Sequence, residues 1–240
     1  IQNGIKHYSS VDENRFMRGA AATNNFGSFD WNMMYSRHLI DGSLLSETNL
    51  SDPELLDVSS FITTGSHRSL NELNDKHTLK ERIAGTHLSY NKKNLEVGLT
   101  AVQTKYNKSL EQNTSAYNQF EFFGDEVINI GADYSYLYKN VNLFGEISYS
   151  PQNFSSVSDF KSLSYLNGAI ISLDKNIDIS LFHRNYSKHY WALLSVALGE
   201  GSTNINEQGI YAGATLTPFK KWELSAYYDA YRFLWLKYLV

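Results

Sequence analysis

Apolar and polar residues alternate along ten segments of the chain with a period of two, which is typical of β-strands that have one apolar face. In residues 127–138, for example, Ile128, Ile130 and Tyr134 alternate with Asn129 and Asp133. A slip of one residue would turn the charged side chains toward the apolar side, so the register of such a strand is well specified. The pattern predicts strands that each separate an apolar wall from a polar wall.

The segments form five hairpins, each joined by a tight polar turn. Asn, Asp, Gly and Pro at these turns suit the backbone angles that a tight turn needs. Longer polar connections separate the hairpins, at about 40–80, 107–126, 150–162 and 188–207. This alternation predicts an antiparallel up-and-down transmembrane β-barrel with short periplasmic turns and long extracellular loops. The predicted pairs are 14–23 with 28–39, 81–90 with 94–106, 127–138 with 141–149, 163–173 with 177–187, and 208–217 with 221–233.

Two of the long connections contain further local signals. Ser69 and Glu72 have the spacing of a capping box, which predicts a short helix within 40–80. The apolar stretch Trp191–Leu198 predicts a second short helix, folded over or into the barrel. About forty residues without a strand pattern, as in 40–80, usually form a functional loop.

A soluble β-sandwich is the main alternative, because its strands alternate as well. The predicted strands are about 9–12 residues long, which matches a tilted bilayer span better than the roughly 5–6 residues of a soluble strand. Aromatic residues near the short turns resemble the girdle at a membrane interface. The predicted girdle consists of Trp31, Tyr90, Tyr136, Tyr138 and Trp222.

The amino-acid composition argues against several classes of function. The chain has 240 residues, a net charge of −4 and no cysteine. The acidic balance argues against nucleic-acid binding, and the lack of cysteine excludes disulfides and thiolate metal sites. Because the chain begins at Ile1 and ends at Val240 directly after a strand, we expect one domain over 1–240, cut at both ends, from a larger barrel in which ten strands are a minimum.

The polar walls carry charges that are predicted to line the lumen: Glu96, Asp133, Glu146, Asp178, Arg184, Glu223 and Asp229. Most of these residues are acidic, which would suit a preference for cations or the anchoring of a basic plug segment. A hydrogen-bonded interior wall is the simpler interpretation, and we favour it.

No arrangement of residues indicates catalysis. His183 and His189 lack the helical spacing of a zinc protease, and Ser66 and His67 are neighbours in an extended loop, where adjacent side chains point apart. His87 and Ser89 share a strand face and would permit a lipid hydrolase, but such pairs occur by chance in almost any barrel. We therefore predict no catalytic residue, no cofactor and no metal site.

Several short strings resemble a known family: Arg15-Phe-Met-Arg-Gly19, Tyr35-Ser-Arg37, Thr64-Gly-Ser-His-Arg68, Asn71-Glu-Leu73, Tyr117-Asn-Gln-Phe120, Arg184-Asn-Tyr186, and Leu224-Ser-Ala-Tyr-Tyr-Asp229 with Arg232-Phe233 and Trp235. Together they resemble the barrel portion of a Bacteroidota outer-membrane family that also carries an N-terminal helix-hairpin-helix region. The resemblance covers essentially the whole chain and implies a bacterial outer-membrane location. Since the helix-hairpin-helix region is missing here, its suggested DNA-binding role applies to no residue of this sequence.

The long, amphipathic connections at 40–80 and 188–207 favour plugging of the lumen or docking of a partner. We therefore predict a non-enzymatic accessory or scaffold subunit of an envelope assembly, secretion or uptake complex. A passive porin-like channel for small solutes is the alternative, and a barrel-embedded lipid hydrolase is a more distant one. The expected partners are outer-membrane lipid, including lipopolysaccharide, and other envelope proteins in a hetero-complex, with no nucleic acid.

Overall fold

All ten predicted strands are present, and an eleventh joins them. The computed structural model describes residues 16–45, 57–62, 64–111, 115–151, 160–201 and 203–237. Within these ranges the chain is all-β, with eleven strands in one sheet that is consistent with a β-barrel. Residues 14 and 15 of the first predicted strand lie outside the described residues.

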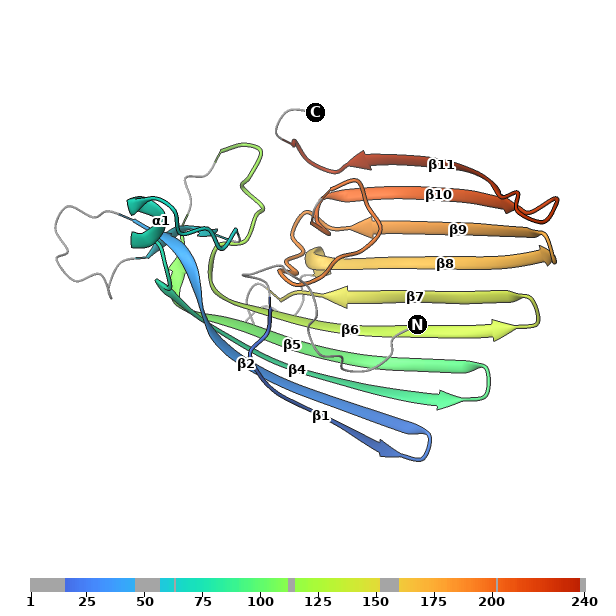
Figure 1. Cartoon of the computed structure of the whole chain (residues 1–240), viewed down its shortest axis with the longest axis horizontal. Coiled ribbons are helices and arrows are strands. Elements are labelled where there is room, and N and C mark those ends of the chain that lie inside the picture. Colours follow the sequence, from blue (N-terminus) through green and yellow to red (C-terminus); the bar gives the residue numbers. More distant parts are fainter. Residues whose placement is uncertain are drawn as a thin grey trace.

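The long strands follow one another antiparallel across the sheet (Figure 1). In order they are β1 (Gly19–Phe26), β2 (Phe29–Leu44), β4 (Leu79–Lys92), β5 (Leu95–Leu110), β6 (Gly124–Tyr138), β7 (Val141–Tyr149), β8 (Leu163–Asp174), β9 (Ile177–Tyr186), β10 (Glu207–Leu216) and β11 (Leu224–Phe233). Besides these strands, the described residues form the helix α1 (Leu70–Asn74) and the 3-10 turn η3 (Phe160–Ser162).

The predicted helix α1 is confirmed, together with its cap. The Ser69 side chain accepts a hydrogen bond from the Glu72 N–H, and the Glu72 carboxylate accepts one from the Ser69 N–H at 2.9 Å. These reciprocal bonds satisfy donors that the start of a helix leaves free.

The hairpin turns lie together at one end of the sheet, the turn end, and the long connections lie at the other, the loop end (Figure 1). The first turn was predicted over residues 24–27, but it occupies Gly27 and Ser28, so that prediction is wrong by about two residues. Pairing continues to Phe26 and Phe29 because Asn25 still bonds across to Asp30. Gly27 has a positive φ of 69°, a conformation that glycine adopts without steric cost.

The eleventh strand corrects the prediction that 40–80 lacks strand structure. Strand β3 (Val58–Ile62) pairs antiparallel with residues 41–44 of β2 and meets Leu110 of β5 in one parallel pairing. It was missed because β2 and β5 extend further than their alternating patterns indicate. Because β2 and β5 are longer than predicted, they offer an edge for pairing. The segment that forms β3 has little alternation of its own and becomes a strand by pairing with that edge.

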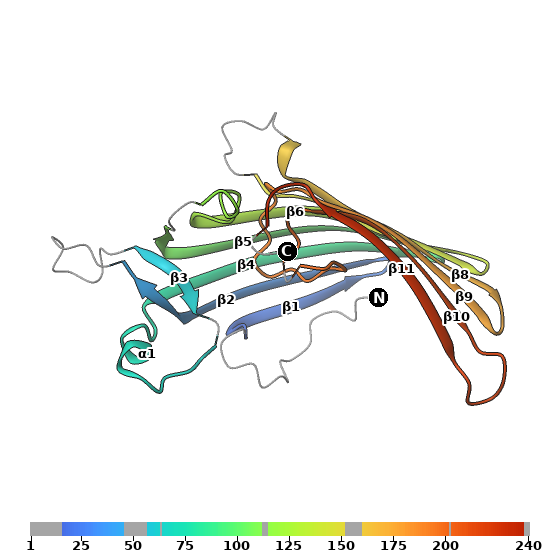
Figure 2. The same ribbon diagram turned by 90° about the horizontal axis from the view of Figure 1, so that it is seen from above.

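The sheet bends into a trough, and residues 187–201 lie on its concave side (Figure 2). Successive side chains alternate between the two faces, so the pairing register assigns each residue to one of them. The concave face carries the predicted polar wall, including Asp133 and Glu146, which are direct cross-strand partners.

The convex face is apolar and exposed over its turn half. We call this surface the apolar belt. On β2 it extends from Phe29 to Tyr35, about 20 Å at the usual rise of a strand. Its exposed members include Phe26, Phe29, Trp31, Tyr35, Leu88, Leu95, Val97, Leu99, Ile130, Tyr134, Tyr136, Tyr138, Leu143, Ile147, Leu181, Ile210, Leu216, Leu224 and Tyr228.

Polar residues replace apolar ones on the convex face toward the loop end. On β2 the change comes at Arg37, whereas on β10 it comes at Gln208. Gln208 belongs to the register row that starts at Trp31. That row continues through Leu88, Leu99, Ala132, Ile147, Tyr165, Asn185 and Gln208 to Arg232. The belt therefore crosses the hydrogen-bonded rows obliquely.

Candidate functional site: the closed loop end of the concave face

The turn half and the loop half of the concave face differ sharply. In the turn half, Asp133, Glu146, Glu96 and Asp178 stand on the polar wall at the strand faces predicted for them. Asp133 and Glu146 face each other, and Asp178 accepts a hydrogen bond from Ser172 at 2.6 Å. Glu223 lies just before β11 in the exposed β10–β11 turn, away from the other residues. The predicted lumen residues therefore do not form a single cluster.

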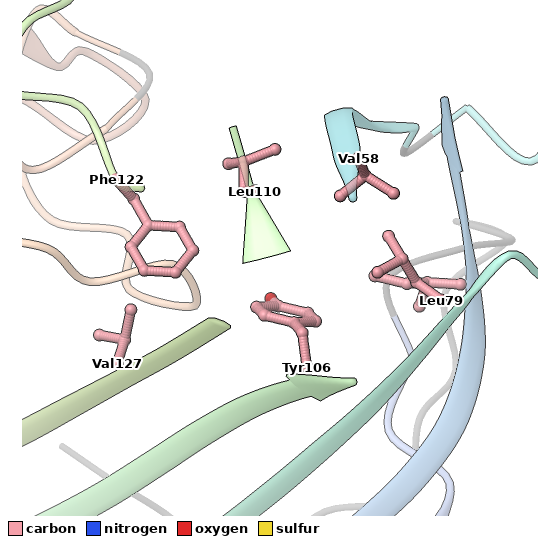
Figure 3. Packing of buried hydrophobic residues seen from close by; sticks show 7 residues of the cluster. Val58, Leu79, Tyr106, Leu110, Phe122 and Val127 are labelled. Atoms are coloured by element: carbon pink, nitrogen blue, oxygen red, sulfur yellow. The ribbon is translucent and has the colours of Figure 1, made fainter. Parts of the chain in front are cut away.

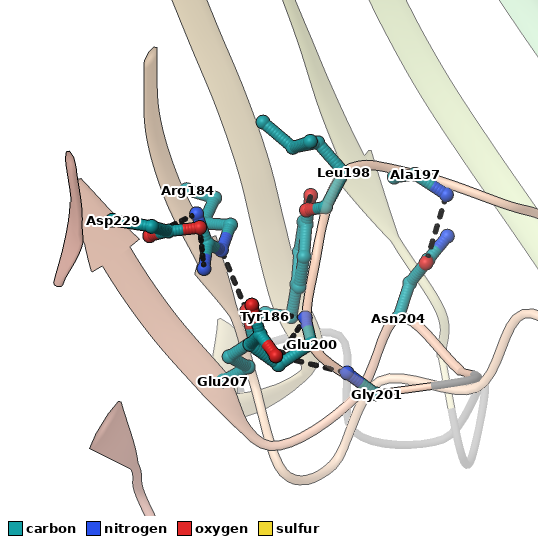
Figure 4. A network of polar contacts seen from close by, with 9 residues as sticks. All are labelled: Arg184, Tyr186, Ala197, Leu198, Glu200, Gly201, Asn204, Glu207 and Asp229. Carbon is teal, nitrogen blue, oxygen red and sulfur yellow. Dashed lines mark hydrogen bonds and ion pairs between the residues drawn. The ribbon is translucent and has the colours of Figure 1, made fainter. Parts of the chain in front are cut away.

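Two of the predicted lumen residues, Arg184 and Asp229, do come together in the loop half (Figure 4). Arg184 is fully buried, and its Nη2 and Nη1 atoms lie 3.1 and 3.0 Å from the two oxygens of Asp229. The Nη2 contact is a hydrogen bond, whereas the Nη1 contact is an ion pair without hydrogen-bond geometry. Gly209 makes room for the guanidinium, since a Cβ there would lie 2.8 Å from Arg184 Cζ.

Sequence reasoning missed the third member of this cluster, Glu207. Its Oε1 lies 2.6 Å from Arg184 Nε, and its side chain is only 1% exposed. The predicted strand began at 208, so Glu207 was placed in the preceding loop. Extending the alternation by one residue would have put Glu207 on the same face as Gly209 and Tyr211, next to Arg184.

The cluster also holds the connection between β9 and β10. The backbone N–H groups of Glu200 and Gly201 donate to the Glu207 carboxylate at 3.0–3.2 Å. The Tyr186 hydroxyl donates to the Leu198 carbonyl at 2.8 Å. Strand residues therefore fix this connection over the concave face rather than leaving it extended from the sheet (Figure 4).

The predicted helix over 191–198 is wrong, although its predicted position over the sheet is correct. No helical turn forms in these residues, all of which are described. Their backbone groups bond to side chains instead: Asn129 donates to the Trp191 carbonyl at 2.6 Å, and the Ala197 N–H donates to Asn204 at 2.9 Å. These bonds, with the one from Tyr186, take the place of the i to i−4 ladder.

An apolar cluster fills the loop half beside these polar contacts (Figure 3). Its buried residues are Ile40, Val58, Leu79, Tyr106, Leu110, Phe122 and Val127, and Leu44, Phe61 and Trp191 pack against it. The ring of Trp191 meets that of Phe122 at 5.4 Å, and its Nε1 donates to the Phe120 carbonyl at 2.9 Å. Residues 115–123 and 187–201 are thereby joined across the concave face.

Tyr190 adds a polar contact to the sheet itself. Its buried hydroxyl donates to Ser148 on β7 at 2.9 Å, and burial raises the pKa of that phenol. The hydroxyl therefore stays neutral. Together with the Arg184 cluster, this contact ties residues 187–201 to strands β7, β9 and β10 across the loop half.

His87 and Ser89, the pair considered for lipid hydrolysis, have separate hydrogen-bond partners. His87 bonds to Thr100 at 2.8 Å and lies 3.9 Å from Asp133, whereas buried Ser89 accepts from Asn91. Among the described residues no hydrogen bond joins His87 to Ser89, so the pair considered for lipid hydrolysis is not assembled. In the same part of the chain, no group of three His, Asp or Glu residues could hold a metal ion.

The predicted girdle residues lie near the turn end. Trp31, Tyr90, Tyr136 and Tyr138 are on the convex face, and Trp222 is exposed in the β10–β11 turn. Tyr90 packs against Phe29 with ring centroids 4.9 Å apart, and Trp31 donates to Thr86 at 2.8 Å.

Comparison with known protein families finds no match for this chain, and comparison with curated proteins finds no significantly similar sequence. The resemblance to a Bacteroidota outer-membrane family therefore stays a prediction. In the described residues, no helix is long and apolar enough to cross a membrane.

Proposed function

We propose that this chain is part of an outer-membrane β-barrel of a Gram-negative bacterium, closed at its loop end. In this proposal it serves as a non-enzymatic scaffold or accessory subunit of an envelope assembly, secretion or uptake complex. The turns face the periplasm and the long connections face the exterior.

The apolar belt supports the membrane location. A soluble monomer rarely exposes a continuous apolar patch of more than a few hundred Å². Here exposed Leu, Ile, Val, Phe, Trp and Tyr side chains run across the convex face from β2 to β11. A band of this kind, about 20 Å along β2, approaches the roughly 25 Å of apolar surface that outer-membrane barrels present to lipid.

The sheet edges agree with a barrel whose closure involves further pairing. Among the described strands, β1 and β11 are the two ends of the sheet and do not pair with each other. Unpaired backbone groups cost several kcal/mol each in hydrocarbon. In the membrane the two edges therefore need strand partners, either each other or strands outside this sheet.

Closure of the loop half is the observation that carries the scaffold role. A passive channel needs a continuous wet path, but buried Arg184, Glu207 and the apolar cluster around Tyr106 occupy the concave face there. Burying charges is costly unless they are fully paired, and these residues are paired with one another and with the β9–β10 connection. Paired charges and apolar packing therefore stabilise the filled loop half of the concave face.

Single-channel recording in planar bilayers tests this proposal. We expect purified protein to insert without a stable open conductance. We expect Trp191→Ala, which removes the contact between the two connections, to produce transient openings. Val196→Ala is the matched control, since Val196 is in the same connection but 93% exposed. A stable open channel in the unmodified protein would favour a solute pore and exclude the closed scaffold.

The subunit role has its own test. Cross-linking in intact outer membranes, followed by mild detergent extraction, should recover the chain with other envelope proteins in a fixed ratio. Recovery of the chain alone, under conditions that preserve a known envelope complex, would contradict the role of a subunit.

A further inference from the structure

Basic residues gather on the convex face directly beyond the apolar belt. Arg37, Arg82 and Lys105 are successive register partners on β2, β4 and β5, and all are exposed. Arg18 adjoins Arg37 through the backbone bond from Arg37 N–H to Arg18 O at 2.9 Å. At the usual strand spacing, this basic row spans about 15 Å.

The basic row borders a hollow of about 510 Å³. Arg18, Arg37, Lys80, His67 and His77 are among the residues that line it. The hollow lies beyond the end of β1, where residues 37–40 of β2 no longer pair with that strand. The loops before and after α1 contribute the histidines, so segments that are distant in the sequence bring nitrogen donors to one place.

These cations have little internal compensation. Among the described residues, no carboxylate lies within ion-pair distance of Arg37, Lys80 or Arg82. Asp41 and Glu126 are engaged elsewhere: Asp41 meets His67 Nε2 at 2.8 Å and the His77 N–H at 2.9 Å, and Glu126 pairs with Lys105 at 3.3 Å. Like charges placed directly opposite on neighbouring strands destabilise a sheet. An anion seated between them would remove this cost.

We propose that the basic row and its hollow bind the phosphate groups of a phosphorylated glycolipid of the lipid A class, whose acyl chains lie along the apolar belt. This inference rests on the proposed membrane location. The ligand is expected to be a lipid because the cations lie immediately beyond Tyr35 and Ala84, where the headgroup of an outer-leaflet lipid would lie. Guanidinium groups suit phosphate because they bind its oxygens through two parallel hydrogen bonds.

The rest of the convex boundary has fewer cations. On β9–β11 the corresponding residues are Asn185, Gln208 and Arg232, and Arg232 donates two hydrogen bonds to Gln208. The phosphate site is therefore local to β1–β5. It differs from a general attraction of basic residues to an anionic membrane surface.

Binding to the detergent-folded chain tests the inference. We would titrate diphosphoryl lipid A, the same lipid without phosphates, phosphatidylglycerol and inorganic phosphate, and follow intrinsic fluorescence and calorimetric heat. At roughly fivefold per cation, Arg37→Glu/Arg82→Glu should weaken diphosphoryl lipid A at least about twentyfold. The control Lys139→Glu/Lys175→Glu changes the net charge equally at the turn end and should bind as the unmodified protein does.

A variant that removes the two charges without reversing them controls for misfolding of the charge-reversed protein. Arg37→Gln/Arg82→Gln removes like-charge repulsion, so it should fold at least as well as the unmodified chain and still bind lipid A at least about tenfold more weakly. Equal lipid A affinity in the neutral variant and the unmodified chain would overturn the inference. Equal binding of dephosphorylated lipid A, of phosphatidylglycerol or of inorganic phosphate alone would overturn it too. An open channel in bilayers would contradict the closed scaffold but leave this test unaffected.

Discussion

The two halves of strand β9 show how one alternating pattern produces two different environments. Asp178, near the turn end, is exposed and accepts a hydrogen bond from its neighbour Ser172. Arg184, on the same face six residues later, is fully buried among Glu207, Asp229 and the returning connection. Alternation decides which face a side chain occupies. What covers that face decides whether the side chain meets solvent or becomes part of a core.

The largest expected effect comes from removing the buried cation. Arg184→Met leaves the carboxylates of Glu207 and Asp229 without their partner, and breaking a buried pair from one side typically costs about 3–5 kcal/mol. Equilibrium unfolding in urea should report this loss. Asp178→Asn, on the same strand and face, should change stability by less than about 1 kcal/mol. Equal losses in the two variants would mean that the two halves do not differ in burial.

Introducing a charge into the apolar belt should have the next largest effect. Leu99→Arg places a cation at the middle of the convex face, which costs about 2–4 kcal/mol at the midplane of a bilayer. Leu137→Arg makes the same change on the concave face, where Leu137 is 47% exposed, and should be tolerated. Folding yield in lipid vesicles, measured by heat-modifiable gel migration, distinguishes the two variants. If both fold equally well, the convex face does not contact lipid.

Loosening the closed end should have a moderate effect. Trp191→Ala removes contacts with Phe122 and the bond to the Phe120 carbonyl. Since Trp191 is only partly buried, we expect a loss of about 2 kcal/mol, below the 3–5 kcal/mol typical of a fully buried tryptophan. Limited proteolysis should then cut within 187–201 while the strands remain protected. Unchanged cleavage would show that this side chain does not hold the connection.

The smallest expected effect concerns the cap of α1 and its pH dependence. Backbone hydrogen bonds from Arg68 and Ser69 lower the pKa of the Glu72 carboxylate. The stability from this carboxylate is therefore present above its ordinary pKa of 4.5 and is lost as the pH falls through the lowered value. The protection of the Arg68, Ser69 and Glu72 amides against hydrogen exchange, relative to their intrinsic rates, should fall locally in acid. Ser69→Ala should show faster exchange already at neutral pH, and identical exchange in both proteins would contradict the capping role.

Local signals in the sequence account for the hairpins and for the faces of the strands. The bounds of β7 agree with prediction because Val141 to Tyr149 alternates cleanly between two close turns, and the pairing of Asp133 with Glu146 follows from that register. The capping box of α1 was equally local. Each of these signals lies within a dozen residues, where period and turn chemistry decide the structure.

Contacts between distant segments were not predictable in the same way. Strand β3 depends on the edge that β2 and β5 offer, and Glu207 gains its role only through Arg184, twenty-three residues earlier. The stretch Trp191–Leu198 is apolar enough for a helix, but Asn129, Asn204 and Tyr186 bond its backbone groups instead. These outcomes depend on which side chains meet across the sheet, and a hydrophobic pattern does not specify that.

The oblique course of the apolar belt has a geometric consequence. Between β2 and β10 the polar boundary moves by six residues, from Arg37 to the row of Trp31, over seven strand-to-strand steps. Given the usual rise per residue and the usual spacing between strands, this displacement means that the strands are tilted by about 30° from the normal to the belt. In closed barrels the strands are tilted by 35–45° from the barrel axis, which is close to this value. The offset between Arg37 on β2 and Gln208 on β10 therefore corresponds to the strand stagger that a closed cylinder requires.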